Sequence, residues 1–137
     1  MTNPDGRLPD RAVGTTHSAD VPELPEPFQT TLEPHRDTIV VVARGEVDGS
    51  TVGRLRGQLR GVLEAGFKRI VLDLREVSFM DSSGLHAVLD FDAASRGADV
   101  QFTLVRGPDA VQRIFELTGT DVALRFIGAG EVDRAWQ

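Results

Sequence analysis

The sequence contains no cysteine, which excludes disulfides, thiolate metal sites and thiol catalysis. Its three histidines, His17, His35 and His86, do not show the spacing of a zinc site. No run approaches 18 apolar residues, and the N-terminus lacks the basic-then-apolar pattern of a signal peptide. We therefore expect a cytoplasmic protein with no metal, no cofactor and no membrane association.

Positive charge is also scarce. Fifteen Lys and Arg residues face 21 Asp and Glu residues, so the net charge is 15 − 21 = −6. A dedicated nucleic-acid binder would carry a basic stripe against phosphate, so we expect no nucleic acid among the partners. The length of 137 residues predicts one domain, and no internal repeat is visible.

Residues 1–27 differ from the rest of the chain. They contain five of the seven prolines, almost no adjacent apolar residues, and a charge of 2 − 5 = −3. Such a segment buries too little apolar surface to offset the entropy of ordering it. We predict a disordered, Pro-rich acidic tail, with a docking motif for a partner as the functional alternative, and an ordered domain over 28–137.

From residue 28 onward, strand and helix patterns alternate. Strands are expected at 28–33, 38–45, 69–74, 100–104 and 122–127, and a turn at 34–37 joins the first two as a hairpin. Apolar residues at helical spacing predict helices over 52–65, 82–97 and 108–118, and a short terminal helix is expected at 131–136. The order predicts an α/β fold with a mixed, mostly parallel sheet of about five strands, packed helices and one antiparallel edge.

The candidate functional residues cluster in "SFMDSSGLH", where a very short loop is expected to join a buried strand to a helix. Asp81, Ser82 and Ser83 are N-cap residue types, and Gly84 allows close backbone approach. A helix N-terminus favours anions, so a serine there suits a bound or covalent phosphoryl group. The simpler interpretation is that the cluster only caps the helix. A serine-hydrolase interpretation is weak, because Met80 replaces the first glycine of G-x-S-x-G and His86 completes no convincing triad.

Three segments resemble a known family in their order and spacing: "GEVDGST" at 45–51, "RIVLDLREVSFMDSSGL" at 69–85 and "PDAVQRIFELTGTD" at 108–121. They resemble the STAS domain, and most of all the stand-alone bacterial anti-sigma factor antagonists. The resemblance covers residues 28–130 and implies a STAS-like fold. It also implies a non-enzymatic protein that regulates transcription by partner switching.

The resemblance assigns roles to individual residues. Ser82 corresponds to the serine that an anti-sigma factor with serine kinase activity phosphorylates, and a serine phosphatase removes the phosphate. The unphosphorylated antagonist binds the anti-sigma factor and frees a sigma factor, whereas the phosphorylated form is released. The implied partner-binding surface consists of Asp48, Asp81, Ser82, Ser83 and Gly84, with Ser83 expected to cap the helix.

Several alternatives remain open at this stage. Asp48 or Ser50 is a candidate cap for the helix over 52–65, and Asp81 for the next one. A metal site on the two aspartates is weak, and the arginines at 54, 56 and 60 are expected to form a solvated face. The rival function is a STAS-type ligand-sensing or scaffold module that is never phosphorylated. Partner switching requires only a monomer, so we expect a monomer or weak dimer.

Overall fold

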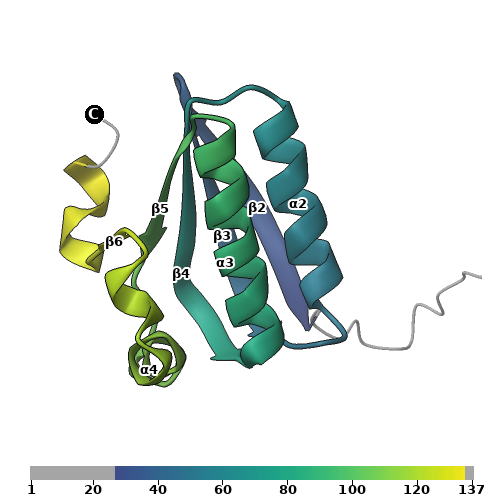
Figure 1. The fold of residues 1–137 in the computed structure, drawn as a ribbon, viewed down its shortest axis with the longest axis vertical. Coiled ribbons are helices and arrows are strands. Elements are labelled where there is room, and N and C mark those ends of the chain that lie inside the picture. Colours follow the sequence, from purple (N-terminus) through teal and green to yellow (C-terminus); the bar gives the residue numbers. More distant parts are fainter. Residues whose placement is uncertain (1–26, 135–137) are drawn as a thin grey trace, which may run out of the picture.

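The computed structural model describes residues 27–134 of the chain (Figure 1). Its elements are, in order, β2 (Phe28–His35), β3 (Thr38–Val47), α2 (Val52–Glu64), β4 (Arg69–Met80), α3 (Ser82–Gly97), β5 (Gln101–Val105), α4 (Asp109–Thr118), the 3-10 helix η1 (Thr120–Val122), β6 (Phe126–Ile127) and the 3-10 helix η2 (Ala129–Arg134). The predicted tail lies outside the described residues, apart from Pro27.

The strands of the described chain form one mixed sheet in the order β2-β3-β4-β5-β6. β2 pairs with β3 in antiparallel orientation, and every other neighbouring pair is parallel. Parallel neighbours require crossover connections, which α2, α3 and α4 provide. The predicted α/β class, the mostly parallel sheet and the antiparallel edge are confirmed.

The helices bury their apolar stripes against one face of this sheet. Figure 1 shows α2 and α3 side by side across it, with α4 near the end of the sheet to which β4 runs. Leu55, Leu59 and Val62 of α2 are buried, as are Val111 and Phe115 of α4. These residues share one core with alternate residues of β3, such as Ile39 and Val41. The alternation arises because successive side chains of a strand point to opposite faces of the sheet.

A second, smaller cluster covers the other face of the sheet. It consists of Val40, Val42, Val71, Val105 and Val132, and Val132 belongs to η2. Burial on both faces is what the unbroken "TIVVV" run of β3 predicts.

The hairpin between β2 and β3 is tighter than predicted. Pro34 and His35 pair with Ile39 and Thr38, so the connecting loop is only Arg36 and Asp37. Arg36 adopts a positive φ of 61°, which lets two residues reverse the chain. Proline is tolerated in β2 because an edge strand has backbone N–H positions without a ladder partner. The predicted turn at 34–37 is therefore wrong by two residues.

The predicted end of β4 at Leu74 is also wrong, because the strand continues to Met80. The apolar run stops at Arg75 and Glu76, which are exposed, yet the parallel pairing with β3 goes on. An ion pair of 3.0 Å between Arg44 and Glu76 joins the two strands there. The charged residues interrupt the apolar pattern, and the register shifts between Val42 and Arg44, but the pairing with β3 resumes at Glu76 and continues to Met80.

The C-terminal elements are shorter than the pattern suggests. Only Phe126 and Ile127 of the expected strand at 122–127 pair with β5. Val122 instead belongs to η1 and is 88% exposed, because the chain turns at Gly119 with a φ of 75°. The expected helix at 131–136 corresponds to η2, of 3-10 type, and residues 135 and 136 lie outside the described range.

Candidate functional site

The sequence-predicted residues gather at the carboxyl ends of β3 and β4, the lower edge of the sheet in Figure 1. These parallel neighbours end in register, with Val47 opposite Met80. The Asp81 amide donates to the Val47 carbonyl at 3.1 Å, which extends the pairing by one residue. The loop of residues 48–51 and the start of α3 therefore leave the sheet next to each other.

Asp81 is the N-cap of α3. Its backbone is extended, with φ −106° and ψ −169°, and its Oδ1 accepts the Ser83 amide at 2.9 Å. This bond satisfies one of the amides that the first helical turn leaves without a partner. The capping interpretation of Asp81 is confirmed, and the capping role expected for Ser83 is wrong, because Ser83 is already the second residue of the helix.

Gly84 allows α3 to approach the sheet closely. A Cβ at this position would lie 2.6 Å from Met80 Cγ and 2.8 Å from Val47 Cγ1, well inside van der Waals contact. Val47 is β-branched and fully buried, so it has little freedom to move. The glycine expected from the sequence to permit close approach does so, against side chains of both strands.

Asp48 shapes the loop before α2 rather than capping the helix. Its Oδ1 accepts the amides of Ser50 at 2.9 Å and Thr51 at 3.2 Å, together with the Ser50 hydroxyl at 2.7 Å. These hydrogen bonds, led by the Ser50 hydroxyl, lower the pKa of the Asp48 carboxyl below its ordinary value of 3.8. The carboxylate is thus held ionised in a turn of fixed shape.

Thr51 occupies the N-cap position of α2, so the expected cap on Asp48 or Ser50 is wrong. The threonine is buried; its Oγ1 donates to the Glu46 carbonyl at 2.7 Å and accepts the Asp48 amide at 3.0 Å. These bonds tie the loop to the end of β3. Sequence reasoning missed this residue, although "DGST" before a helical pattern offers Thr51 as a further cap type.

The two loops meet across a short distance. A Cβ on Gly49 would lie 3.8 Å from Ser83 Oγ, an ordinary van der Waals separation. Ser83 is therefore half-buried against the 48–51 loop, whereas Ser82 is exposed. Among residues 27–134 the Ser82 hydroxyl has no hydrogen-bond partner. Of the two adjacent serines, Ser82 is the accessible one.

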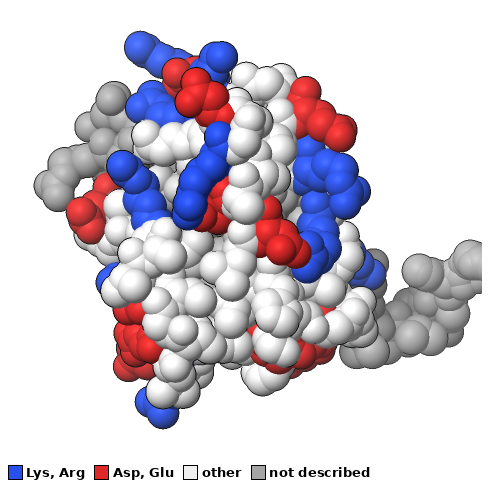
Figure 2. All heavy atoms as spheres, viewed as in Figure 1, with Lys and Arg blue, Asp and Glu red and all other residues white. Residues whose placement is uncertain are grey.

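The exposed serine lies next to Asp81, at the edge of an uncharged surface. Figure 2 shows an uncharged surface over the lower end of α3, with acidic side chains below it and paired acidic and basic side chains above it. Phe79, next to Met80 at the end of β4, is 48% exposed. This aromatic residue was not singled out from the sequence, where it is one more apolar residue of a strand. Exposed aromatic residues are enriched in protein interfaces.

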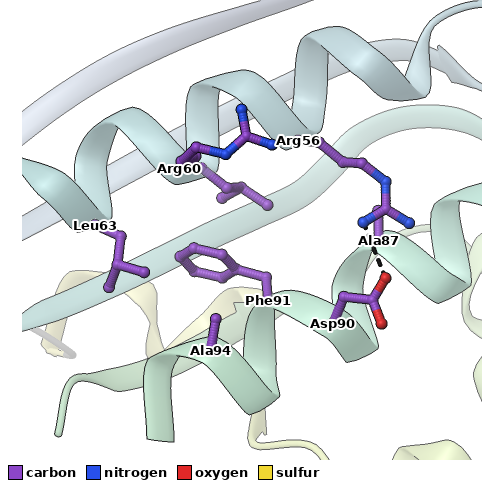
Figure 3. A pocket seen from close by; sticks show the side chains of 8 residues that line it. Arg56, Arg60, Leu63, Ala87, Asp90, Phe91 and Ala94 are labelled. Atoms are coloured by element: carbon purple, nitrogen blue, oxygen red, sulfur yellow. Dashed lines mark hydrogen bonds and ion pairs between the residues drawn. The ribbon is translucent and has the colours of Figure 1, made fainter. Parts of the chain in front are cut away.

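A groove of about 160 Å³ runs between α2 and α3, away from the serines (Figure 3). Leu59, Leu63 and Phe91 are among its apolar lining residues, and an ion pair of 2.9 Å between Arg56 and Asp90 lies at one end. Small-molecule sites usually measure about 300–1,000 Å³, so this groove does not favour the ligand-sensing alternative.

The arginines of α2 are less free than a solvated face would require. Arg56 pairs with Asp90 of α3, and Arg54 donates to the Phe28 carbonyl at 3.1 Å.

Within the described part of the chain, no group of three or more acidic or histidine side chains has the arrangement of a metal site. No helix among residues 27–134 is long and apolar enough to cross a membrane.

The model of the STAS domain family matches residues 29–127, so the chain belongs to this family. The resemblance noted in three sequence segments is thereby confirmed. Within the family, the chain resembles anti-sigma factor antagonists. The anti-sigma-B factor antagonist of Staphylococcus aureus is 33% identical over 75 residues, which are 55% of this chain and 69% of that protein.

Solved structures agree with this similarity. An anti-sigma factor antagonist from Mycobacterium paratuberculosis has a TM-score of 0.67 at 28% identity, with 72% of this chain and 84% of the other covered. The antagonist SpoIIAA in its unphosphorylated form has a TM-score of 0.64 at 26% identity, covering 77% and 95%. Its phosphorylated form shares the fold, with a TM-score of 0.60 at 24% identity and coverage of 77% and 98%. The segments aligned with the curated relatives span 50% to 69% of those relatives.

Proposed function

We propose that this protein is an anti-sigma factor antagonist that phosphorylation of Ser82 switches off. In this proposal the unmodified chain binds an anti-sigma factor with serine kinase activity, and a sigma factor is freed. The kinase then phosphorylates Ser82 and the complex separates, until a serine phosphatase restores the unmodified form. The chain itself performs no catalytic step.

The observation that carries the proposal is the different environment of the two serines. Asp81 already caps α3 through the Ser83 amide, so the Ser82 hydroxyl is not needed to complete the helix. It is exposed at the first residue of α3, where a kinase can reach it. Ser83 is half-buried instead, and its Oγ faces Gly49 of the 48–51 loop.

Electrostatics explains how a single phosphate can separate a complex without unfolding the protein. The added group carries about −1.5 to −2 charges and would be stabilised by the N-terminal end of the α3 dipole. The same charge is added next to Asp81, at the edge of an uncharged patch, in a protein whose net charge is −6. A partner packed over that patch would have to desolvate the phosphate beside the Asp81 carboxylate, so binding weakens sharply.

The Asp48 loop supplies the second part of the proposed binding surface. Its carboxylate is fixed by the Ser50 and Thr51 amides, and Gly49 brings the loop against Ser83. In this proposal Asp48, Asp81, Ser82 and Ser83 form the binding surface, and Gly84, which is buried against Val47 and Met80, positions the helix beneath it.

The proposal is tested with the anti-sigma factor kinase that co-purifies with the tagged protein from its own cells. Incubation with this kinase and ATP should add one phosphate to the wild type and to Ser83→Ala, and none to Ser82→Ala, as measured by intact mass. In calorimetry without ATP, Ser82→Ala should bind like the wild type. Ser82→Asp should bind more weakly, because it carries about half of the phosphate charge.

Two outcomes would contradict this switch. Phosphate transfer to Ser82→Ala but not to Ser83→Ala would move the site by one residue. Equal affinity of Ser82→Asp and wild type, measured at two salt concentrations, would show that charge at this position does not control the complex.

A further inference from the structure

His86 lies one helical turn after Ser82, at the i+4 position of α3. Both residues are exposed, so they share the outward face of the helix. The Cα–Cβ bonds of a helix tilt toward its N-terminus, and a side chain covers the turn that precedes its own Cα. The turn that the imidazole covers is the one that begins at Ser82.

We propose that His86 binds the phosphoryl group of phosphorylated Ser82, with its protonated imidazole donating an N–H to a phosphate oxygen. The inference rests on the proposed phosphorylation of Ser82 and adds a phosphomonoester-binding side chain to that site. The bond is charge-assisted, and its donor and acceptor lie on the same helix, so no other element needs to move to form it.

The surrounding charges leave this role to His86. The first three turns of α3 contain no lysine or arginine, and the basic residue of this helix, Arg96, is in the last turn. Arg56 of α2 is paired with Asp90, which is one turn beyond His86. The nearby carboxylates of Asp81 and Asp48 are acceptors that repel a phosphate.

The consequence is a phosphorylated state whose charge is partly neutralised by the protein itself. An imidazolium beside a phosphomonoester stabilises the dianion over the monoanion, so it lowers the second pKa of phosphoserine from its ordinary value of about 6.

The test uses the full chain with phosphoserine incorporated at position 82 during translation, which requires no kinase. Phosphorus-31 NMR then follows the phosphate between pH 4 and 8 in three forms: wild type, His86→Gln and His35→Gln. His35 is at the hairpin end of β2, opposite the site, so its substitution is the matched control. We expect the phosphoserine pKa in the wild type and in His35→Gln to be lower than in His86→Gln by about 0.1–0.4 unit. The difference should shrink in 1 M NaCl, since the pair is exposed.

Identical titration of wild type and His86→Gln would overturn the inference, as would a difference that 1 M NaCl leaves unchanged. Neither result bears on whether the kinase modifies Ser82, which intact mass decides separately. Failure of the phosphate contact and failure of the proposed function are therefore distinguishable.

Discussion

Replacement of Gly84 by alanine should destabilise the protein, although glycine is normally a poor residue within a helix. Alanine is favoured over glycine in a helix by about 1 kcal/mol. Here the added Cβ would lie 2.6 Å from Met80 Cγ and 2.8 Å from Val47 Cγ1. Met80 is flexible and can adjust, but Val47 is rotamerically stiff and fully buried.

Overpacking of a buried site costs about 1–3 kcal/mol, with a strained side chain or a shifted backbone as the origin. After the gain in helix propensity is subtracted, about 0–2 kcal/mol remain, and because Val47 is stiff and buried we expect Gly84→Ala to be less stable by about 1 kcal/mol. For a chain of this size that lowers Tm by about 4–8 °C, measured by thermal unfolding followed by circular dichroism.

Gly57→Ala is the matched control, because Gly57 is exposed on α2 and a Cβ there would meet nothing within 4 Å. That variant should be stabilised by about 0.5–1 kcal/mol. The pair of substitutions should therefore change Tm in opposite directions. A Tm for Gly84→Ala equal to or above that of the wild type would refute the packing argument.

A double variant tests whether the contact with Val47 causes the loss of stability in Gly84→Ala. Val47→Ala removes the Cγ1 atom that the new Cβ would strike, so Gly84→Ala should cost less in that background than in the wild type. The expected coupling is about 1 kcal/mol, and additive effects would show that Val47 is not the obstacle.

Two further predictions concern aspartates outside this contact. Asp81→Ala should lose about 1 kcal/mol of unfolding free energy, because the Asp81 Oδ1 accepts the Ser83 amide. Asp81→Ser should retain most of that stability, since serine is also a good N-cap residue. Equal urea midpoints for the two variants would contradict the capping role. Asp37 has a pKa below its ordinary 3.8, first because the Arg69 guanidinium donates to it at 3.0 Å and also through the charge of Arg69. A lowered folded-state pKa means that the stabilisation is present above about pH 4 and is lost as the pH falls through the folded value. The stability advantage of wild type over Asp37→Asn should therefore be full at pH 6 and smaller at pH 3, and an advantage that grows on acidification would refute this sign.

Much of the fold follows from local pattern. The unbroken apolar run of β3 predicts burial on both faces, and the 3.6-residue spacing of Leu55, Leu59 and Val62 predicts the buried stripe of α2. Alternation of strands and helices then favours parallel pairing, because crossover helices return the chain to the same edge. The cluster at 81–84 was visible as a helix start for the same local reason.

The ends of the helices and strands, and the helix caps, depend on contacts with residues outside the local sequence pattern. β4 extends to Met80 because β3 continues beside it, even where Arg75 and Glu76 break the apolar run. Only Phe126 and Ile127 form the last strand, because residues 120–122 wind into η1 instead of extending along β5. Thr51, rather than Asp48 or Ser50, occupies the N-cap position of α2, and its hydroxyl donates to the Glu46 carbonyl instead of capping the helix.

By itself, the sequence determined which residues prefer strand, helix and cap, because these preferences arise from side-chain shape and from hydrogen bonds within a few residues. The tertiary structure alone decided that Gly49 faces Ser83 and that Ser82 stays exposed, because both depend on where two crossovers leave the same sheet edge. Gly84 shows both the sequence effect and the tertiary effect. A missing Cβ is visible in the sequence, but the side chains of Val47 and Met80 that require its absence come together only in the folded sheet.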